Sequence, residues 1–142
     1  MAKKQKTIIE RLQDIYTLIP DDVGCKHCHH CCGPIVWFKP EDENIRTFLK
    51  KNKMEYMIWT TEEFKKNNDH CPYLKQDRCS IYPVRPIVCR LQGTIAQLPC
   101  HQHATQQISK QQHAAVKRAM DALVKDCNGV GLLFGTRKFK LK

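Results

Sequence analysis

Cysteine is the residue type that most constrains this chain. Nine of the 142 residues are cysteines, and Cys25, Cys28, Cys31 and Cys32 fall within eight consecutive positions. Residues 25–32 contain only Cys, His and one Lys, so no apolar side chain gives a helix or a strand a reason to form there. The segment needs an external organiser, and clustered cysteines in a reducing compartment usually bind metal or carry out redox chemistry.

The spacing of this first cluster is that of a metal site. Two-residue spacers allow successive sulfurs to converge on one centre, as in zinc sites and cubane iron–sulfur sites. The adjacent Cys31 and Cys32 point in different directions on most backbones. We therefore expect one of these two cysteines to serve a second purpose.

A second group of cysteines follows at Cys71, Cys79 and Cys89. These thiols are too far apart in sequence to form one local site. We expect them to act by folding back onto the first cluster, and that closure would define the domain.

Five submotifs in order carry a resemblance to a known family. The double-cysteine cluster is followed by CPYL at 71–74, CSIY at 79–82, RP at 85–86 and CR at 89–90. This arrangement resembles the CxxCxxCC family of zinc- or iron-chelating domains, also called YkgJ-type cysteine-cluster proteins. The resemblance implies metal binding by Cys25, Cys28, Cys31, Cys32, Cys71, Cys79 and Cys89. Larger members resemble flagellin lysine methylases that carry an iron–sulfur cluster, so an enzymatic role, methyl transfer, rests here on distant analogy alone, and we lean against it.

Two kinds of metal group suit these thiols. Cys25, Cys28 and Cys31 with Cys71-Pro72 imitate the grouping of a bacterial ferredoxin, which favours a 4Fe-4S cluster with a redox or electron-transfer role. The alternative is a structural zinc ion held by Cys25, Cys28 and two of the three later cysteines. Either centre carries about −2 in charge, and Arg85 and Arg90 beside Cys89 are candidates to donate hydrogen bonds to the sulfurs, or else to pair with surface carboxylates.

We expect the remaining thiols and imidazoles not to bind metal. We expect the histidines of the first cluster to be spectators once sulfur saturates the metal, Cys100 to be a packed thiol beside two exposed imidazoles, and Cys127 to pack in the core. The histidines of the first cluster are His27, His29 and His30, and the two imidazoles beside Cys100 are His101 and His103.

Apolar periodicity predicts two long helices, at 7–19 and 105–127, a short strand at 35–38 and a further helix from Pro40 to about Asn52. Residues 54–70 fit both strand alternation and a capped helical turn at Thr61. Three prolines between Cys71 and Arg90 allow only short elements. The predicted fold is a small α+β, mainly helical single domain over 1–142, in which sulfur and metal, rather than apolar side chains, organise irregular loops over 25–90, followed by a basic tail at 135–142.

Charge and hydropathy restrict location and partners. The formal charge of the chain is +10. No apolar run approaches the ~20 residues of a membrane span, and no apolar core of a signal peptide follows the basic first residues. We therefore expect a cytoplasmic protein. The basic termini favour an acidic partner, and the alternative function is a module that docks on RNA, DNA or a ribonucleoprotein while zinc stabilises its fold. Solvated ends explain the same lysines.

Overall fold

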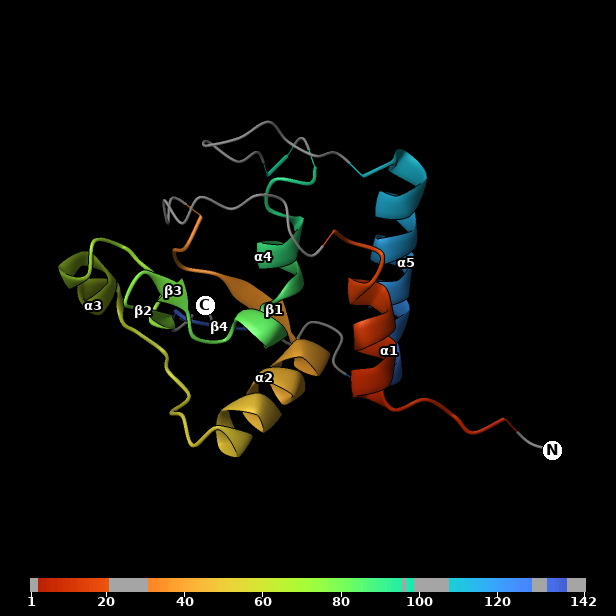
Figure 1. Ribbon diagram of the computed structural model, residues 1–142, viewed down its shortest axis with the longest axis horizontal. Coiled ribbons are helices and arrows are strands. Elements are labelled where there is room, and N and C mark those ends of the chain that lie inside the picture. Colours follow the sequence, from red (N-terminus) through yellow and green to blue (C-terminus); the bar gives the residue numbers. More distant parts are fainter. Residues whose placement is uncertain (1–2, 21–30, 96, 99–107, 129–132, 138–142) are drawn as a thin grey trace.

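The computed structural model describes residues 3–20, 31–95, 97–98, 108–128 and 133–137 (Figure 1). It is a mainly helical α+β fold, as predicted. The helices are α1 (Ile8–Tyr16), α2 (Lys39–Lys51), α3 (Thr61–Lys66), the 3₁₀ helix η1 (Tyr82–Val84), α4 (Ile87–Leu91) and α5 (Lys110–Asp126). The strands are β1 (Val36–Phe38), β2 (Leu74–Lys75), β3 (Arg78–Cys79) and β4 (Leu133–Gly135).

Helix α1 begins where its sequence predicts and ends earlier. The Thr7 hydroxyl accepts a hydrogen bond from the Glu10 amide at 3.1 Å, and the Glu10 carboxylate accepts one from the Thr7 amide at 2.7 Å, which completes a capping box. The helix stops at Tyr16 rather than at residue 19. Beyond Tyr16 the Leu18 and Ile19 amides bond three residues back, to the Ile15 and Tyr16 carbonyls, so the chain continues as tight turns up to Pro20.

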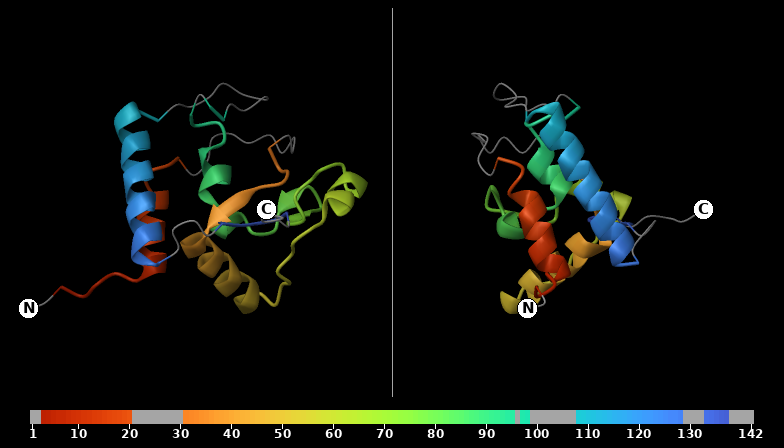
Figure 2. Two further views of the ribbon diagram at one scale, coloured as in Figure 1. Left: turned by 180° about the vertical axis from the view of Figure 1, so that it is seen from behind. Right: turned by 90° about the vertical axis from the view of Figure 1, so that its right-hand side faces the viewer.

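Helix α5 lies beside α1 in all three ribbon views (Figure 2). Ser109 caps its start, Asn128 has a left-handed φ of 53° just beyond its end, and residues 105–107 of the predicted helix lie outside the described residues. An ion pair of 2.8 Å joins Arg11, early in α1, to Asp126, the last residue of α5, so the two helices run antiparallel. Between them lies one apolar core of nine residues: Leu12, Ile15, Tyr16, Ile19, Ile87, Val116, Met120, Leu123 and Val124.

The middle of the chain has an apolar core of its own. Strand β1 pairs antiparallel with β4, Trp37 opposite Phe134, and the Trp37 side chain is buried beneath the pair. Helix α2 follows β1 at once, close to the predicted limits. Seven buried residues form this second core: Trp37, Ile45, Leu49, Cys71, Tyr73, Ile81 and Val84. The expectation that apolar side chains do not hold the middle together is therefore wrong, since burial of such side chains supplies the same kind of stabilisation here as in any small domain.

The segment 54–70 takes the helical alternative only at its end. A capping box between Thr60 and Glu63 starts α3. Before this helix the backbone is extended: the Met57 amide donates a hydrogen bond to the Tyr73 hydroxyl at 2.8 Å, and the Trp59 amide donates one to the Thr136 carbonyl at 2.7 Å. Residues 71–91 form only short elements, as their prolines require.

The C-terminal strand reaches into the predicted basic tail. Gly135 ends β4, Thr136 is buried, and Arg137 donates a hydrogen bond to the Thr61 hydroxyl at 2.8 Å. Residues 138–142 lie outside the described residues. Of the helices that the structure describes, none combines the length and apolar character needed to cross a membrane.

Candidate metal centre

Five of the seven predicted ligand cysteines lie in the described residues, and three segments carry them. Cys31 and Cys32 precede β1, Cys71 precedes the short β2–β3 hairpin, Cys79 is the last residue of its second strand, and Cys89 lies in α4. Figure 1 shows α4 next to β1, with the hairpin to one side of them, toward α3. Cys25 and Cys28 lie outside the described residues.

The backbone joins the first two of these segments directly. The Cys71 amide donates a hydrogen bond of 2.9 Å to the Cys32 carbonyl. At the next residue, Gly33, an added Cβ atom would lie 3.2 Å from the Asp69 carbonyl oxygen, closer than ordinary van der Waals contact. Glycine at this position therefore allows the two cysteine-bearing segments to approach closely.

A tight hairpin places Cys79. Gln76 and Asp77 have φ values of 50° and 61°, the left-handed conformation that a two-residue hairpin turn requires. The resulting register sets Cys79 opposite Leu74, and the Ser80 amide donates to the Tyr73 carbonyl at 2.7 Å. The turn thus returns Cys79 to the neighbourhood of Cys71.

The described thiols are close enough for their charges to interact. Burial first, then charge on Cys71 and Cys79, raises the pKa of Cys89 well above its usual value. Burial likewise raises the pKa of Cys71 to about 12 and raises that of Cys79, with a smaller contribution from Cys79 in the first case and from Cys31 in the second. The hydrogen bond between Cys31 and Cys32 lowers the pKa of Cys31 and raises that of Cys32.

In most of these thiols the dominant influences, burial and neighbouring thiols, favour the protonated form. Several thiolates in one buried place repel one another, so burial and repulsion favour the protonated form. A bound cation reverses this preference, because metal-bound thiols lose their protons. Among the described residues, no three Cys, His, Asp or Glu side chains are already arranged so as to hold a metal ion.

The two candidate arginines occupy different environments. The Arg85 guanidinium lies 3.8 Å over the Tyr82 ring, and its charge lowers the pKa of Cys79, in opposition to the larger effect of burial. Arg90 is buried, lies 3.8 Å over the Tyr16 ring, and donates to the carbonyls of Arg85 at 2.9 Å and Pro83 at 3.0 Å. These hydrogen bonds of Arg90 thus hold the turn that leads into α4.

Glu41 is a buried group beside this turn that the sequence analysis did not single out. Its side chain is fully buried, and it accepts hydrogen bonds from the Tyr16 hydroxyl at 2.7 Å and the Ile87 amide at 2.5 Å. Burial raises its pKa to about 7, against the opposing effect of these hydrogen bonds and of Arg90. In the sequence, Glu41 looks like an ordinary acidic residue in the first turn of a helix. No local pattern distinguishes it, because its burial depends on α1 and α4.

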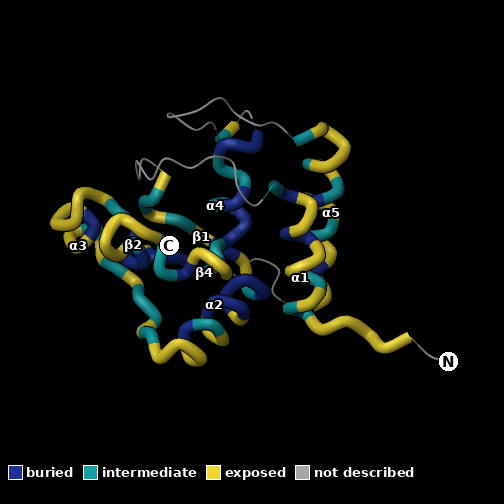
Figure 3. Tube along the Cα trace, viewed as in Figure 1, coloured by how far each residue is buried: buried dark blue, intermediate teal, exposed yellow. Residues whose placement is uncertain are grey.

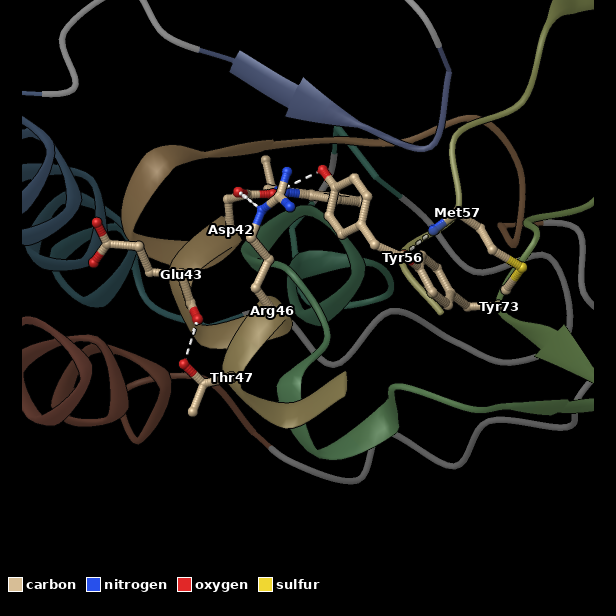
Figure 4. Close-up of polar contacts among 8 residues, drawn as sticks. Asp42, Glu43, Arg46, Thr47, Tyr56, Met57 and Tyr73 are labelled. Atoms are coloured by element: carbon tan, nitrogen blue, oxygen red, sulfur yellow. Dashed lines mark hydrogen bonds and ion pairs between the residues drawn. The ribbon is translucent and has the colours of Figure 1, made fainter. Parts of the chain in front are cut away.

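The neighbouring Asp42 organises a separate polar cluster (Figure 4). Its carboxylate accepts hydrogen bonds from the Trp37 indole at 2.9 Å, the Tyr56 hydroxyl at 2.8 Å and Arg46 at 2.6 Å. The Arg46 guanidinium also lies 3.9 Å over the Tyr56 ring. These partners tie α2 to β1 and to the extended segment before α3.

The other predicted thiols and imidazoles fall in two groups. Cys127 is buried at the end of α5, and its thiol donates to the Val124 carbonyl at 3.3 Å, which is consistent with the predicted packing role. The rest lie outside the described residues: His27, His29, His30, Cys100, His101 and His103.

Comparison with known proteins gives one match. No curated protein and no solved structure matches the chain. A family model, CxxCxxCC, described as a putative zinc- or iron-chelating domain, matches residues 24–128. The match covers most of the chain and contains all seven predicted ligand cysteines as well as Glu41 and Asp42. The chain therefore belongs to the CxxCxxCC family of zinc- or iron-chelating domains.

Proposed function

We propose that this protein binds a 4Fe-4S cluster through its cysteines and uses it for electron transfer or redox sensing. The observation that carries the proposal is the convergence of Cys71, Cys79 and Cys89. Cys79 lies close enough to raise the pKa of Cys71, and both of these thiols raise the pKa of Cys89. Residues far apart in sequence thus bring soft donors to one place. Thiolate ligands suit iron–sulfur clusters and zinc, and they do not suit magnesium or calcium.

The ligands are drawn from seven cysteines. Cys31 and Cys71 are common to the ferredoxin-like grouping and to the described thiol cluster, and Cys25 and Cys28 complete that grouping. Cys32, Cys79 and Cys89 then surround the centre as further thiols, or exchange with members of the first set. The full candidate set is Cys25, Cys28, Cys31, Cys32, Cys71, Cys79 and Cys89.

The chain's own residues tune such a centre. A bound cluster would supply one-electron redox chemistry, and the burial of Cys71, with the partial burial of Cys89, would limit the access of water to the sulfurs. Arg85 contributes positive charge next to Cys79, which offsets the negative charge of a thiolate-bound centre. A structural zinc ion is the alternative occupant for the same donors.

Anaerobic purification tests the proposal. Elemental analysis, acid-labile sulfide and visible absorption separate a brown iron–sulfur protein from a colourless zinc protein. We expect iron and sulfide in equal amounts. Zinc without iron would overturn the cluster and retain a metal centre, whereas a folded protein that holds neither metal would overturn both.

Two buried cysteines form a matched pair of variants. Cys71 and Cys127 are 8% and 9% exposed, but only Cys71 lies in the thiol cluster. Cys71→Ser should lose most of its metal, and Cys127→Ser should retain a full complement. Equal metal content in the two variants would contradict the ligand role of Cys71.

A further inference from the structure

Helix α4 presents Cys89 to the other thiols, yet the helix is too short to hold its own position. It has five residues, well below the ~12–15 that an isolated helix needs for marginal stability. Its orientation must therefore come from contacts outside the helix. Figure 3 shows α4 in the colours of buried and intermediate residues, next to the buried start of α2.

One contact fixes the first residue of this helix. The Ile87 amide, two positions before Cys89, donates a hydrogen bond of 2.5 Å to the Glu41 Oε2 atom. The Tyr16 hydroxyl donates to the same oxygen at 2.7 Å, and the Phe38 amide donates to Oε1 at 3.4 Å. The carboxylate thus connects α1, the start of α2 and the start of α4 through one buried group.

The residue after Cys89 is held as well. Arg90 lies over the Tyr16 ring, whose hydroxyl binds Glu41, and it donates to two carbonyls of the turn before α4. Residues on both sides of Cys89 are therefore tied to the same buried network. We infer that Glu41 is a positioning residue for the metal centre: by holding the start of α4, its carboxylate sets where the Cys89 sulfur lies. This inference rests on the proposed metal-binding function.

If only its charge mattered, Glu41 would weaken metal binding rather than support it. Its negative charge raises the pKa of Cys89 and so disfavours the thiolate that a metal requires. The carboxylate also satisfies the Tyr16 hydroxyl and the Ile87 amide, so its loss would cost stability as well. Its effect on the charge of the sulfur does not account for this residue, whereas a demand for fixed geometry does. The two explanations make predictions of opposite sign.

The Glu41→Gln variant measures that sign. Titration with Co²⁺, whose visible spectrum reports thiolate coordination, gives both an affinity and a spectroscopic signature. If Glu41 positions Cys89, the variant should bind Co²⁺ about tenfold to hundredfold more weakly, with an altered spectrum. If only its charge matters, binding should become tighter. Unchanged or tighter binding would overturn the inference.

Asp42 supplies the matched control. It is adjacent in sequence and also buried, but its hydrogen-bond partners lie in β1, α2 and the segment before α3. Asp42→Asn should lower the thermal midpoint and leave the Co²⁺ affinity and spectrum as in the parent protein. An equal loss of affinity in both variants would show a merely structural role for Glu41.

A second variant covers the case in which Glu41→Gln does not fold. Tyr16→Phe keeps the aromatic ring beneath Arg90 and removes only the hydroxyl that restrains Glu41. We expect a smaller loss of Co²⁺ affinity in the same direction, and an unaltered affinity would count against the inference. Failure of the parent protein to bind any metal would instead overturn the proposed function, and the positioning role with it.

Discussion

The Cys71 amide and the Cys32 carbonyl are joined by a hydrogen bond of 2.9 Å. This bond connects the two halves of the cysteine pattern through backbone atoms. Beside it, the Gly33 Cα approaches the Asp69 carbonyl so closely that a Cβ atom would lie at 3.2 Å. The junction therefore combines a paired amide with a close backbone approach that leaves little room for a side chain.

Substitution of Gly33 tests this junction. Gly33→Val places a branched side chain against the backbone of Asp69, which cannot move aside as a flexible side chain would. We expect a loss of about 1–3 kcal/mol in the free energy of unfolding, together with lower metal content, because overpacking separates the two segments. Chemical denaturation and elemental analysis measure the two effects. A variant as stable as the parent would indicate that the segments do not need this close approach.

Arg85 provides a test of charge at the centre. Its guanidinium lowers the pKa of Cys79, so Arg85→Gln should raise that pKa and let protons compete better with metal. The metal should then be released at a higher pH, and affinity at neutral pH should fall by about tenfold. Release is followed with a chromophoric chelator as the pH is lowered.

Arg78 is the control for that experiment. It carries the same charge and precedes Cys79 in sequence, but its side chain is exposed and its charge is screened by water. Arg78→Gln should shift the release curve less than Arg85→Gln. Equal shifts would mean that net charge, and not the placement of Arg85, controls metal retention.

Glu41 should titrate near neutral pH. Its pKa in the folded protein is raised from 4.5 to about 7, chiefly by burial. Between these values the unfolded chain has released the proton and the native protein retains it, so stability falls as the pH rises and levels off above about 7. A pKa difference of one unit corresponds to ~1.4 kcal/mol, so the loss is on the order of 3 kcal/mol.

Nuclear magnetic resonance of the labelled Glu41 carboxyl carbon measures this pKa directly. A midpoint near 4.5, the ordinary value, would contradict the described burial. The Glu41→Gln variant supplies the thermodynamic control, since its free energy of unfolding should lack this component of the pH dependence.

Local signals in the sequence predict the helices well. Apolar periodicity predicts both long helices, and Thr7 caps α1 at its predicted start. The described part of α5 begins at Lys110, after the Ser109 cap, within the predicted range 105–127. Asn128 takes the left-handed conformation expected just beyond α5. Such capping signals act within a few residues, so they do not depend on how the rest of the chain folds.

The contacts between distant segments could not be predicted in the same way. Trp37 and Tyr73 fill the central core because β4 and the β2–β3 hairpin return to β1 and α2, and no periodicity encodes that return. Glu41 becomes buried for the same reason, since Tyr16 and Ile87 come from other helices. The cysteine pattern itself predicted a convergence of segments, while the apolar side chains that accompany it were too scattered in sequence to identify as a core.

The C-terminal boundary of the fold is the last feature that can be tested. The Ile35 amide donates to the Thr136 hydroxyl at 3.2 Å, the Thr136 amide donates back to the Ile35 carbonyl at 3.1 Å, and the Trp59 amide donates to the Thr136 carbonyl at 2.7 Å. A chain truncated after Arg137 should keep these bonds and the thermal midpoint of the full chain. Truncation after residue 132 removes β4 and leaves buried amides unpaired, each at a cost of about 1–3 kcal/mol, so its midpoint should fall sharply. If both truncated chains melt alike, β4 contributes nothing to the stability of the fold.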